Sequence, residues 1–371
     1  MAKPQKDMKL NEKIQAFEDE LKNTKYNKRT QGAVGLLKAK IARLKDEHIR
    51  KASKTVKGEG YAVRKSGDAS VILVGFPSVG KSTLLNTLTD ADSPVAAYEF
   101  TTLTVIPGLL EYKSAKIQIL DVPGIIHGAA SGRGRGKEVL AVAASCDLVV
   151  LIVDVFHPEH IEVLRHELYD TNIRLNQHKP VVKIVRKPKG GISLASTVQL
   201  NNIDRNTAAA IFREYRIANA DVIIRSDITV EQLIDAIEAN KRYIPGIVVL
   251  NKIDMVDSET LKRIRDEIKP DLCISADRKD NMEELKELIF KKLNFMRVYC
   301  KETGKPADMN EPMIIFSGAT LKDMCEKLHR DFIKKFKYAR VWGKSVKFDG
   351  QRILKLEHKL HDEDVVELHV I

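Results

Sequence analysis

Residues 75–82 read Gly-Phe-Pro-Ser-Val-Gly-Lys-Ser, and this stretch decides the fold. It matches the pattern GxxxxGK[ST], and it lies between an apolar, strand-like run at residues 71–74 and a helical pattern that begins at Lys81. A strand, a glycine-containing turn and a helix in this order are the context that identifies a phosphate-binding loop. The glycines let successive N–H groups face the phosphates, and the helix N-terminus adds partial positive charge.

Individual roles follow from the chemistry of a bound triphosphate. We expect Lys81 to reach the β- and γ-phosphates and the Ser82 hydroxyl to ligate Mg²⁺. Gly80 has to approach the phosphates without a Cβ. A chance glycine turn is the alternative interpretation, and the strand and helix on either side argue against it. The other predicted nucleotide contacts in the loop are Gly75, Pro77, Ser78, Val79 and Thr83.

A second motif, Asp-Val-Pro-Gly, ends the next apolar run. Its Asp121 is expected to hold Mg²⁺, usually through water, and the Gly124 N–H to contact the γ-phosphate. Between the two motifs, Thr101 and Thr102 compete to close over Mg²⁺ when a γ-phosphate is present, and we favour Thr102. The alternative for both threonines is that they are β-branched residues of an ordinary strand.

Residues 251–254, Asn-Lys-Ile-Asp, follow another apolar run and predict a base-reading loop. The Asp254 carboxylate can accept two hydrogen bonds from guanine, a donor pair that adenine lacks, so GTP is favoured over ATP. Lys252 would cover the base and Asn251 would tie loops together. About twenty residues later, Ser275 and Ala276 end the next strand, and we expect the Ala276 N–H to bond guanine O6.

Many GTPases have a glutamine directly after the Asp-x-x-Gly motif that orients the attacking water. Here that position is Ile125, whose aliphatic side chain cannot hold water, so intrinsic hydrolysis should be slow. The groups that could substitute are a monovalent cation near Ser78, His127, Arg133 or Arg135, or a residue from a partner. A solvated loop is the plain alternative for the histidine and the arginines.

Four further apolar runs have the length and composition of buried strands, and helical patterns lie between them. This alternation predicts an α/β fold with a doubly wound, mostly parallel sheet. The strand runs are residues 116–121, 147–154, 247–251 and 271–275, and the helical patterns are clearest at residues 136–144 and 282–293.

Between about residues 155 and 244 the alternation of strand runs and helical patterns becomes irregular. This stretch holds a basic loop at residues 183–191 and two helical patterns, so we predict an inserted subdomain. Near the C-terminus, short strands and one helix, residues 320–336, predict a small α+β domain. The predicted organisation is a basic helical hairpin (1–66), the first part of a G domain (67–155), the insertion (156–244), the second part of the G domain (245–294) and a C-terminal domain (295–371).

Charge is distributed unevenly along the chain. Residues 1–66 hold eighteen Lys/Arg and eight Asp/Glu, so this segment has a net charge of +10 of the +11 carried by the whole chain. Its apolar residues recur at helical spacing on both sides of a short polar break, which predicts the antiparallel hairpin. A basic arm on a near-neutral body indicates a polyanionic partner, either nucleic acid or anionic lipid. A merely solvated hairpin that packs on its own G domain is the alternative.

Several protein classes are excluded by composition. No apolar run approaches the roughly 18–20 residues of a membrane span, and no apolar segment of a secretory signal follows the basic N-terminus. The cysteines form no CxxC pair, so a disulfide framework or zinc site is not expected and a reducing, cytoplasmic compartment fits best. The cysteines are Cys146, Cys273, Cys300 and Cys325.

These motifs together resemble the Obg-related GTPases, and more narrowly the developmentally regulated GTP-binding protein family. The resemblance implies a P-loop G domain with an N-terminal helical hairpin, an inserted α+β subdomain like ribosomal protein S5, and a C-terminal TGS domain of β-grasp form. It covers nearly the whole chain, although His127 stands where an acidic residue is common. The stretches that carry it are GFPSVGKSTLL, AAYEFTTLT, DVPGIIHGA, GRGRGKEV, IRLNQHKP, KPKGGISL and FKYARVWGKSVK.

The resemblance also implies an activity and partners. Family members bind GTP or GDP with Mg²⁺, are typically stimulated by K⁺, and are associated with ribosomes and translation. Eukaryotic members have a dedicated stabilising partner protein, and the sequence leaves such a partner open. We therefore expect a monomeric, slow GTPase that couples nucleotide state to ribosome or RNA binding.

Two alternatives belong to different classes. A passive GTP-binding module with negligible turnover is compatible with Ile125. A membrane-surface switch is disfavoured, because Ala2 stands where N-myristoylation needs glycine and no CaaX cysteine ends the chain.

Overall fold

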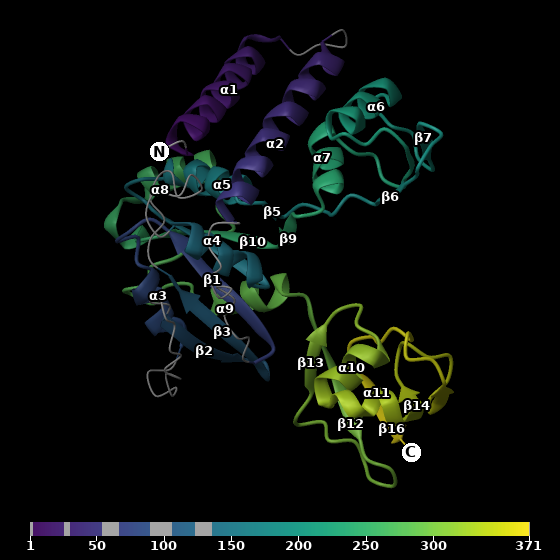
Figure 1. Cartoon of the computed structure of the whole chain (residues 1–371). Coiled ribbons are helices and arrows are strands. Elements are labelled where there is room, and N and C mark those ends of the chain that lie inside the picture. The colour runs from purple at the N-terminus through teal and green to yellow at the C-terminus, as the bar shows by residue number, and fades with distance from the viewer. Residues whose placement is uncertain (1–2, 26–29, 54–66, 90–105, 123–135, 371) are drawn as a thin grey trace. The chain divides into compact units, whose positions relative to one another are not determined.

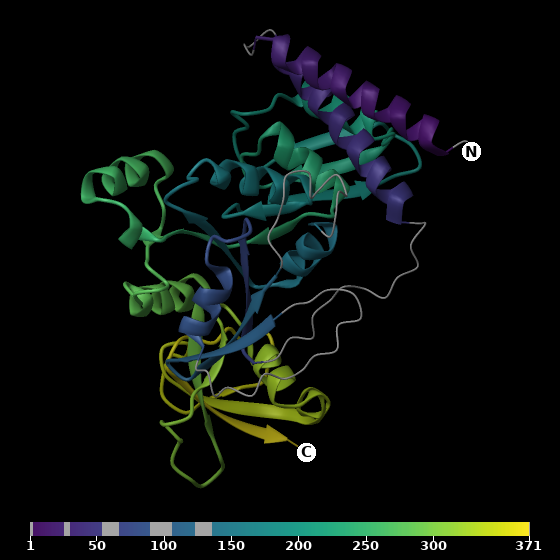
Figure 2. The ribbon, with the colours of Figure 1, turned by 90° about the vertical axis from the view of Figure 1, so that its left-hand side faces the viewer.

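The structure is a computed structural model, and it divides into two compact units (Figures 1 and 2). Unit 1 comprises Met1–Gly60 and Gln177–Tyr243, and unit 2 comprises Tyr61–Asn176 and Ile244–Ile371. Within the described part of the chain, no helix is long and apolar enough to cross a membrane. The described residues are 3–25, 30–53, 67–89, 106–122 and 136–370.

The main sheet of unit 2 has six strands in the order β11-β10-β4-β1-β3-β2. All neighbours are parallel except the edge pair of β2 and β3. β1 and β4 are buried at every position, as expected for strands of a parallel sheet with both faces covered. The predicted doubly wound sheet is therefore confirmed. The strands are β1 (Ala69–Gly75), β2 (Ile106–Tyr112), β3 (Ala115–Asp121), β4 (Leu148–Asp154), β10 (Gly246–Asn251) and β11 (Leu272–Cys273).

Helices cover this sheet with apolar stripes. In α3, for example, Leu84, Leu85 and Leu88 recur at helical spacing and are buried in the core of the sheet. A short pair of strands, β5 (Ile173–Leu175) and β9 (Arg242–Ile244), lies where the chain leaves and re-enters the unit. The helices are α3 (Lys81–Leu88), α4 (Gly136–Ser145), α5 (His160–Asp170), η1 (Ile253–Met255), α8 (Ser258–Ile268) and α9 (Met282–Lys292).

The C-terminal part of unit 2 is a separate five-stranded sheet in the order β13-β12-β16-β14-β15. Helix α10 packs Leu321 and Met324 against Val298 and Val341 on one face of this sheet. The small α+β domain that the sequence pattern predicts and the β-grasp form that the resemblance implies are both confirmed. The elements are β12 (Phe295–Lys301), β13 (Met313–Phe316), α10 (Leu321–Leu328), α11 (Arg330–Lys335), β14 (Phe336–Trp342), β15 (Gln351–Ile353) and β16 (Asp364–Val370).

The single helix predicted at residues 320–336 is wrong. The backbone of His329 is extended, with φ −170° and ψ 140°, and this ends α10 and starts α11. Residue 336 already belongs to β14. The apolar spacing continued across His329, so periodicity alone could not locate the break.

Unit 1 combines the N-terminal hairpin with the insertion. Helices α1 and α2 run alongside each other (Figure 1), and α2 packs on α6 and α7. Ala39 of α2 is fully buried in a core with Phe212 and Leu233, so the hairpin is packed on the insertion. The elements are α1 (Lys3–Asn23), α2 (Gln31–Ser53), β6 (Val182–Arg186), β7 (Ile192–Ser196), α6 (Arg205–Glu214), β8 (Ala220–Ile224) and α7 (Val230–Glu238), and the sheet order is β6-β8-β7.

Two predicted boundaries in this region differ from the structure. The basic loop expected at residues 183–191 is a strand, β6, as far as Arg186, because Val182 and Ile184 pack on the core of unit 1. The insertion was expected from residue 156, but its compact unit starts at Gln177. Helix α5 lies in unit 2, where its Leu164 and Leu168 are part of the main core.

The contact between α2 and α6 generates a prediction at Gly35. A Cβ on Gly35 would lie 2.8 Å from Cγ2 of Thr207, which is buried and held by its own hydrogen bond to Asp204. Gly→Ala within a helix normally stabilises by about 1 kcal/mol. We expect Gly35→Ala to destabilise unit 1 by roughly 1–3 kcal/mol instead, measured by urea unfolding.

Gly32→Ala is the matched control in the same helix, because its Cβ would be 3.4 Å from Thr207 Oγ1, an ordinary contact. It should be neutral or stabilising. Equal stabilisation by both alanine substitutions would show that the contact between Gly35 of α2 and Thr207 of α6 is not tight.

Candidate nucleotide-binding site

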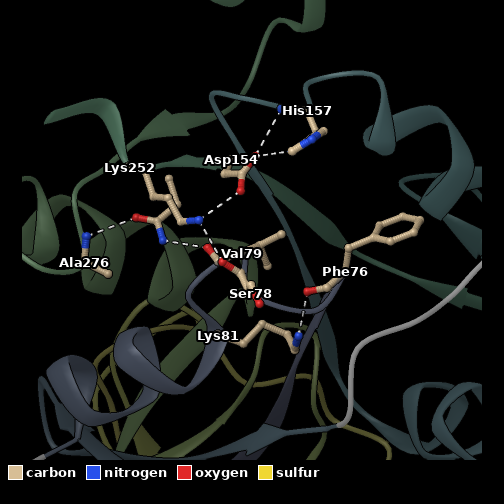
Figure 3. A network of polar contacts seen from close by, with 9 residues as sticks. Phe76, Ser78, Val79, Lys81, Asp154, His157, Lys252 and Ala276 are labelled. Carbon is tan, nitrogen blue, oxygen red and sulfur yellow. Dashed lines mark hydrogen bonds and ion pairs between the residues drawn. The ribbon is translucent and has the colours of Figure 1, made fainter. Parts of the chain in front are cut away.

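The phosphate-binding loop joins the end of β1 to the start of α3, at the edge where β3, β4 and β10 also end (Figure 3). Lys81 is 7% exposed, and its Nζ donates hydrogen bonds to the carbonyl oxygens of Phe76 (2.9 Å) and Gly75 (3.3 Å). Burial lowers the pKa of Lys81, and the nearby Asp121 charge opposes that shift. The Lys81 ammonium is thus bound by backbone carbonyl oxygens of the phosphate-binding loop itself.

The two glycines of the loop are required by close contacts. A Cβ on Gly75 would lie 2.6 Å from the carbonyl oxygen of Ile152 in β4. Gly80 has φ +96°, which favours glycine, and its Cβ would lie 2.4 Å from Asn251 Nδ2. Gly80 is therefore needed to seat the Asn251 side chain, in addition to the expected approach of phosphate.

Ser82 and Asp121 form a pair suited to a divalent cation. The Ser82 hydroxyl donates to Asp121 Oδ2 at 2.5 Å, and Asp121 is 5% exposed. Its other oxygen, Oδ1, is buried without a hydrogen-bond partner among the described residues. An unpartnered buried carboxylate oxygen beside a hydroxyl fits Mg²⁺. Elsewhere in the described part of the chain there is no cluster of three or more His, Cys, Asp or Glu that could hold a metal ion.

Asn251 ends β10 and joins two loops. Its Nδ2 donates to the Val79 carbonyl oxygen at 2.9 Å, and its Oδ1 accepts from the Ala276 N–H at 3.0 Å. Asn251 is 2% exposed, so both bonds are shielded from water. Because the Ala276 N–H already donates to Asn251, its assignment to guanine O6 stays a prediction and would require a shared hydrogen.

Lys252 connects the base-reading loop to the phosphate loop. It has φ +63°, and its Nζ donates to the Ser78 carbonyl oxygen at 2.7 Å and to Asp154 Oδ2 at 3.0 Å. Asp154 also accepts from the His157 N–H at 3.1 Å. Burial by itself would raise the pKa of Asp154, but Lys252 and His157 together hold it below its ordinary value.

Asp154 and His157 were missed by the sequence analysis. The available signal was that Asp154 ends an apolar strand run, as Asp121 and Asn251 do. Beyond them, the ring of His160 stacks on Phe76 with centroids 4.0 Å apart, and the His157 ring lies 5.0 Å from that of His160. This stack braces the second residue of the phosphate loop from the side of α5.

Asp254 has the properties of an ionised acceptor. A hydrogen bond from the Ser275 hydroxyl lowers the pKa of Asp254, and the Arg278 guanidinium, with Nε 3.6 Å from Oδ2, acts in the same direction. Ser275 is fully buried, so its hydroxyl is shielded from water. The carboxylate is thus ready to accept hydrogen bonds from a base.

The remaining predicted residues fall into two groups. Pro77 and Thr83 lie in the described loop and the first turn of α3, with no polar side-chain contact to the network. The others lie outside the described residues, so their roles stay predictions. These are Thr101, Thr102, Gly124, Ile125, His127, Arg133 and Arg135.

Comparison with known protein families also identifies a GTPase domain followed by a TGS domain. The family model described as 50S ribosome-binding GTPase matches residues 70–187, that for the C-terminal region of this domain matches residues 189–295, and that for the TGS domain matches residues 296–370.

Curated relatives match over nearly their full length. An uncharacterized GTP-binding protein of Methanocaldococcus jannaschii is 53% identical over 97% of this chain and 92% of its own. Developmentally-regulated GTP-binding protein 1 of Xenopus laevis is 45% identical over 96% and 98%, and its Dictyostelium discoideum homolog is 46% identical over 97% and 99%.

Gly80→Ala tests the contact with Asn251. The new Cβ must displace Asn251 Nδ2 and adopt a left-handed backbone, at about 1–2 kcal/mol for the backbone alone. We expect affinity for guanine nucleotide to fall more than tenfold, measured with a fluorescent GDP analogue.

Gly304→Ala is its control, because Gly304 has φ +80° and open space around it. This variant should lose only the backbone contribution to stability and bind nucleotide normally. Unchanged affinity in Gly80→Ala would show that the Asn251 seat is not needed for binding.

Proposed function

Since the chain belongs to the developmentally regulated GTP-binding protein family, we propose that it hydrolyses GTP slowly to GDP and phosphate, and that the bound nucleotide controls its attachment to ribosomal RNA. The observation that carries the proposal is the buried Asn251 side chain, which joins the phosphate loop to the Ser275–Ala276 loop. Because one side chain fixes both loops, the spacing between them is set. This spacing supports binding of a ligand whose base and phosphates are a fixed distance apart.

The chemistry divides among the residues at the end of the sheet. Lys81 would leave the Gly75 and Phe76 carbonyls to contact the β- and γ-phosphate oxygens, where its charge offsets the charge that develops on them. Ser82, Asp121 and Thr102 would hold Mg²⁺, which neutralises phosphate charge when bound. Gly124 would donate its N–H to the γ-phosphate.

Slow hydrolysis follows from Ile125, which cannot orient water. We propose that K⁺ near Ser78 supplies part of the missing positive charge. Ser78 is exposed, and its carbonyl oxygen accepts a hydrogen bond from the Lys252 ammonium at 2.7 Å, so this part of the loop already contacts a cation. An additional cation there would lie beside the phosphates, where charge stabilisation is most effective.

RNA is the partner that the charge distribution favours. Unit 1 holds 27 Lys/Arg and 15 Asp/Glu, a net charge of +12 against +11 for the whole chain, so unit 2 is close to neutral. Positive charge concentrated in one unit gives strongly salt-dependent affinity for a polyanion. The family description of ribosome binding supports a ribosomal partner. We also propose that the protein is monomeric and that it acts in the cytoplasm.

Asp254→Asn tests the reading of the base. An amide cannot accept both guanine donors, and the loss of two hydrogen bonds to a charged group should weaken GTP binding about a hundredfold. Xanthosine triphosphate, which offers an acceptor in place of one donor, should become the preferred ligand in competition assays.

Asp257→Asn is the control, because Asp257 caps α8 and asparagine caps nearly as well. It should keep guanine selectivity. If Asp254→Asn also keeps it, Asp254 does not read the base.

Phosphate release in K⁺ and in Na⁺, with and without ribosomes, tests the proposed activity. We expect a slow basal rate that K⁺ or ribosomes raise at least several-fold, with Lys81→Ala inactive throughout. Tight GTP binding without turnover under every condition would favour the passive module instead.

A further inference from the structure

The face of the C-terminal sheet opposite α10 carries alternating aromatic and basic side chains. Residues of β14 alternate, so Ala339 and Val341 enter the core while Tyr338, Arg340 and Trp342 point the other way. Arg352 of β15 is directly opposite Arg340, and His369 of β16 is opposite Tyr338. We call this set, together with Lys301 of β12, the open sheet face; Figure 2 shows the strands that form it.

Two stacked columns organise the open sheet face. In the first, the Arg352 guanidinium carbon lies 4.0 Å from the centroid of the Tyr338 ring, and the His369 ring stacks on Tyr338 with centroids 4.2 Å apart. In the second, Lys301 Nζ lies 4.9 Å from the centroid of Trp342. Arg352 is exposed, and its planar guanidinium ends the first column.

Arg340 and Arg352 are an unfavourable pair in isolation. Like charges directly opposite each other on neighbouring strands are destabilising. Both arginines are exposed, and neither has a carboxylate within ion-pair distance among the residues that the structure describes. Glu367 is opposite Arg340 on the other side, but its carboxylate is bound by Lys301 and by His369 Nε2 at 2.6 Å. The face therefore has positive charge that an external anion could neutralise.

From these observations we propose that the open sheet face binds single-stranded RNA, with Arg340 on a backbone phosphate and a base stacked on the guanidinium of Arg352. Arginine planes and aromatic rings are the groups on which unpaired bases stack, and guanidinium pairs well with phosphate. A protein ligand with carboxylates would satisfy the charge but would make no use of the flat column. The proposal rests on the proposed function, because it names a second RNA contact on unit 2.

The test is fluorescence anisotropy of a labelled single-stranded RNA oligonucleotide with the full chain at several salt concentrations. Arg340→Ala/Arg352→Ala should bind at least tenfold more weakly, and the slope of log affinity against log salt should flatten by roughly 1. Its unfolding midpoint should stay close to that of the wild type, because relief of the repulsion offsets the loss of the contact between Arg352 and Tyr338. Lys262→Ala/Arg263→Ala, on the exposed side of α8, should bind like the wild type.

Arg352→Lys separates stacking from charge. Lysine keeps the charge without the planar group, so affinity should fall about tenfold while the salt slope is kept. Wild-type affinity in the double variant would overturn the sheet-face site and leave RNA binding by unit 1 standing. Wild-type protein that binds ribosomes but not the oligonucleotide would also overturn it. Protein that binds neither would overturn the proposed function as well.

Discussion

The buried side chain of Asn251 is the interaction on which the site depends. One amide donates to the phosphate loop at Val79 and accepts from the second base-site loop at Ala276. Both partners are backbone groups, so the side chain fixes the loops themselves rather than other side chains. Space for it exists only because Gly80 has no Cβ. An unsatisfied amide at this depth would cost about 1–3 kcal/mol, so the three segments are expected to form together.

The sequence predicted the parts of the site that are contiguous motifs. Lys81, Ser82, Asp121 and Asn251 meet at one edge because parallel strands of a doubly wound sheet end there, a rule that needs no coordinates. Asp154 could not be assigned in the same way. Its role is to hold the Lys252 ammonium between its own carboxylate and the Ser78 carbonyl, and that contact arises from the strand order, which a single sequence does not give.

The fold was predictable from the sequence where the hydrophobic pattern matches one type of secondary structure. It was not predictable where tertiary contacts determine the secondary structure. β1 and β4 are buried at every position and mostly apolar, and the sequence located them to within a residue or two. At His329 the apolar spacing continues through a break at which the backbone is extended. Lys183 and Arg186 were read as loop because they are charged, yet alternate residues of that strand pack on the core.

The chain passes from unit 2 into unit 1 and back next to the strand that carries Asn251. β10 begins just after the chain returns from unit 1 and ends at Asn251, so the insertion is rooted in the strand that leads into the base-reading loop. At the other root, the Asn176 side chain brackets Gly246, accepting from its N–H at 2.8 Å and donating to its carbonyl at 3.0 Å. Any rearrangement of Asn251 therefore acts on a strand only six residues long. β10 pairs with β4 at all six positions and with β11 at Val249 and Leu250, so a displacement of Asn251 would strain the same sheet in which the insertion is anchored.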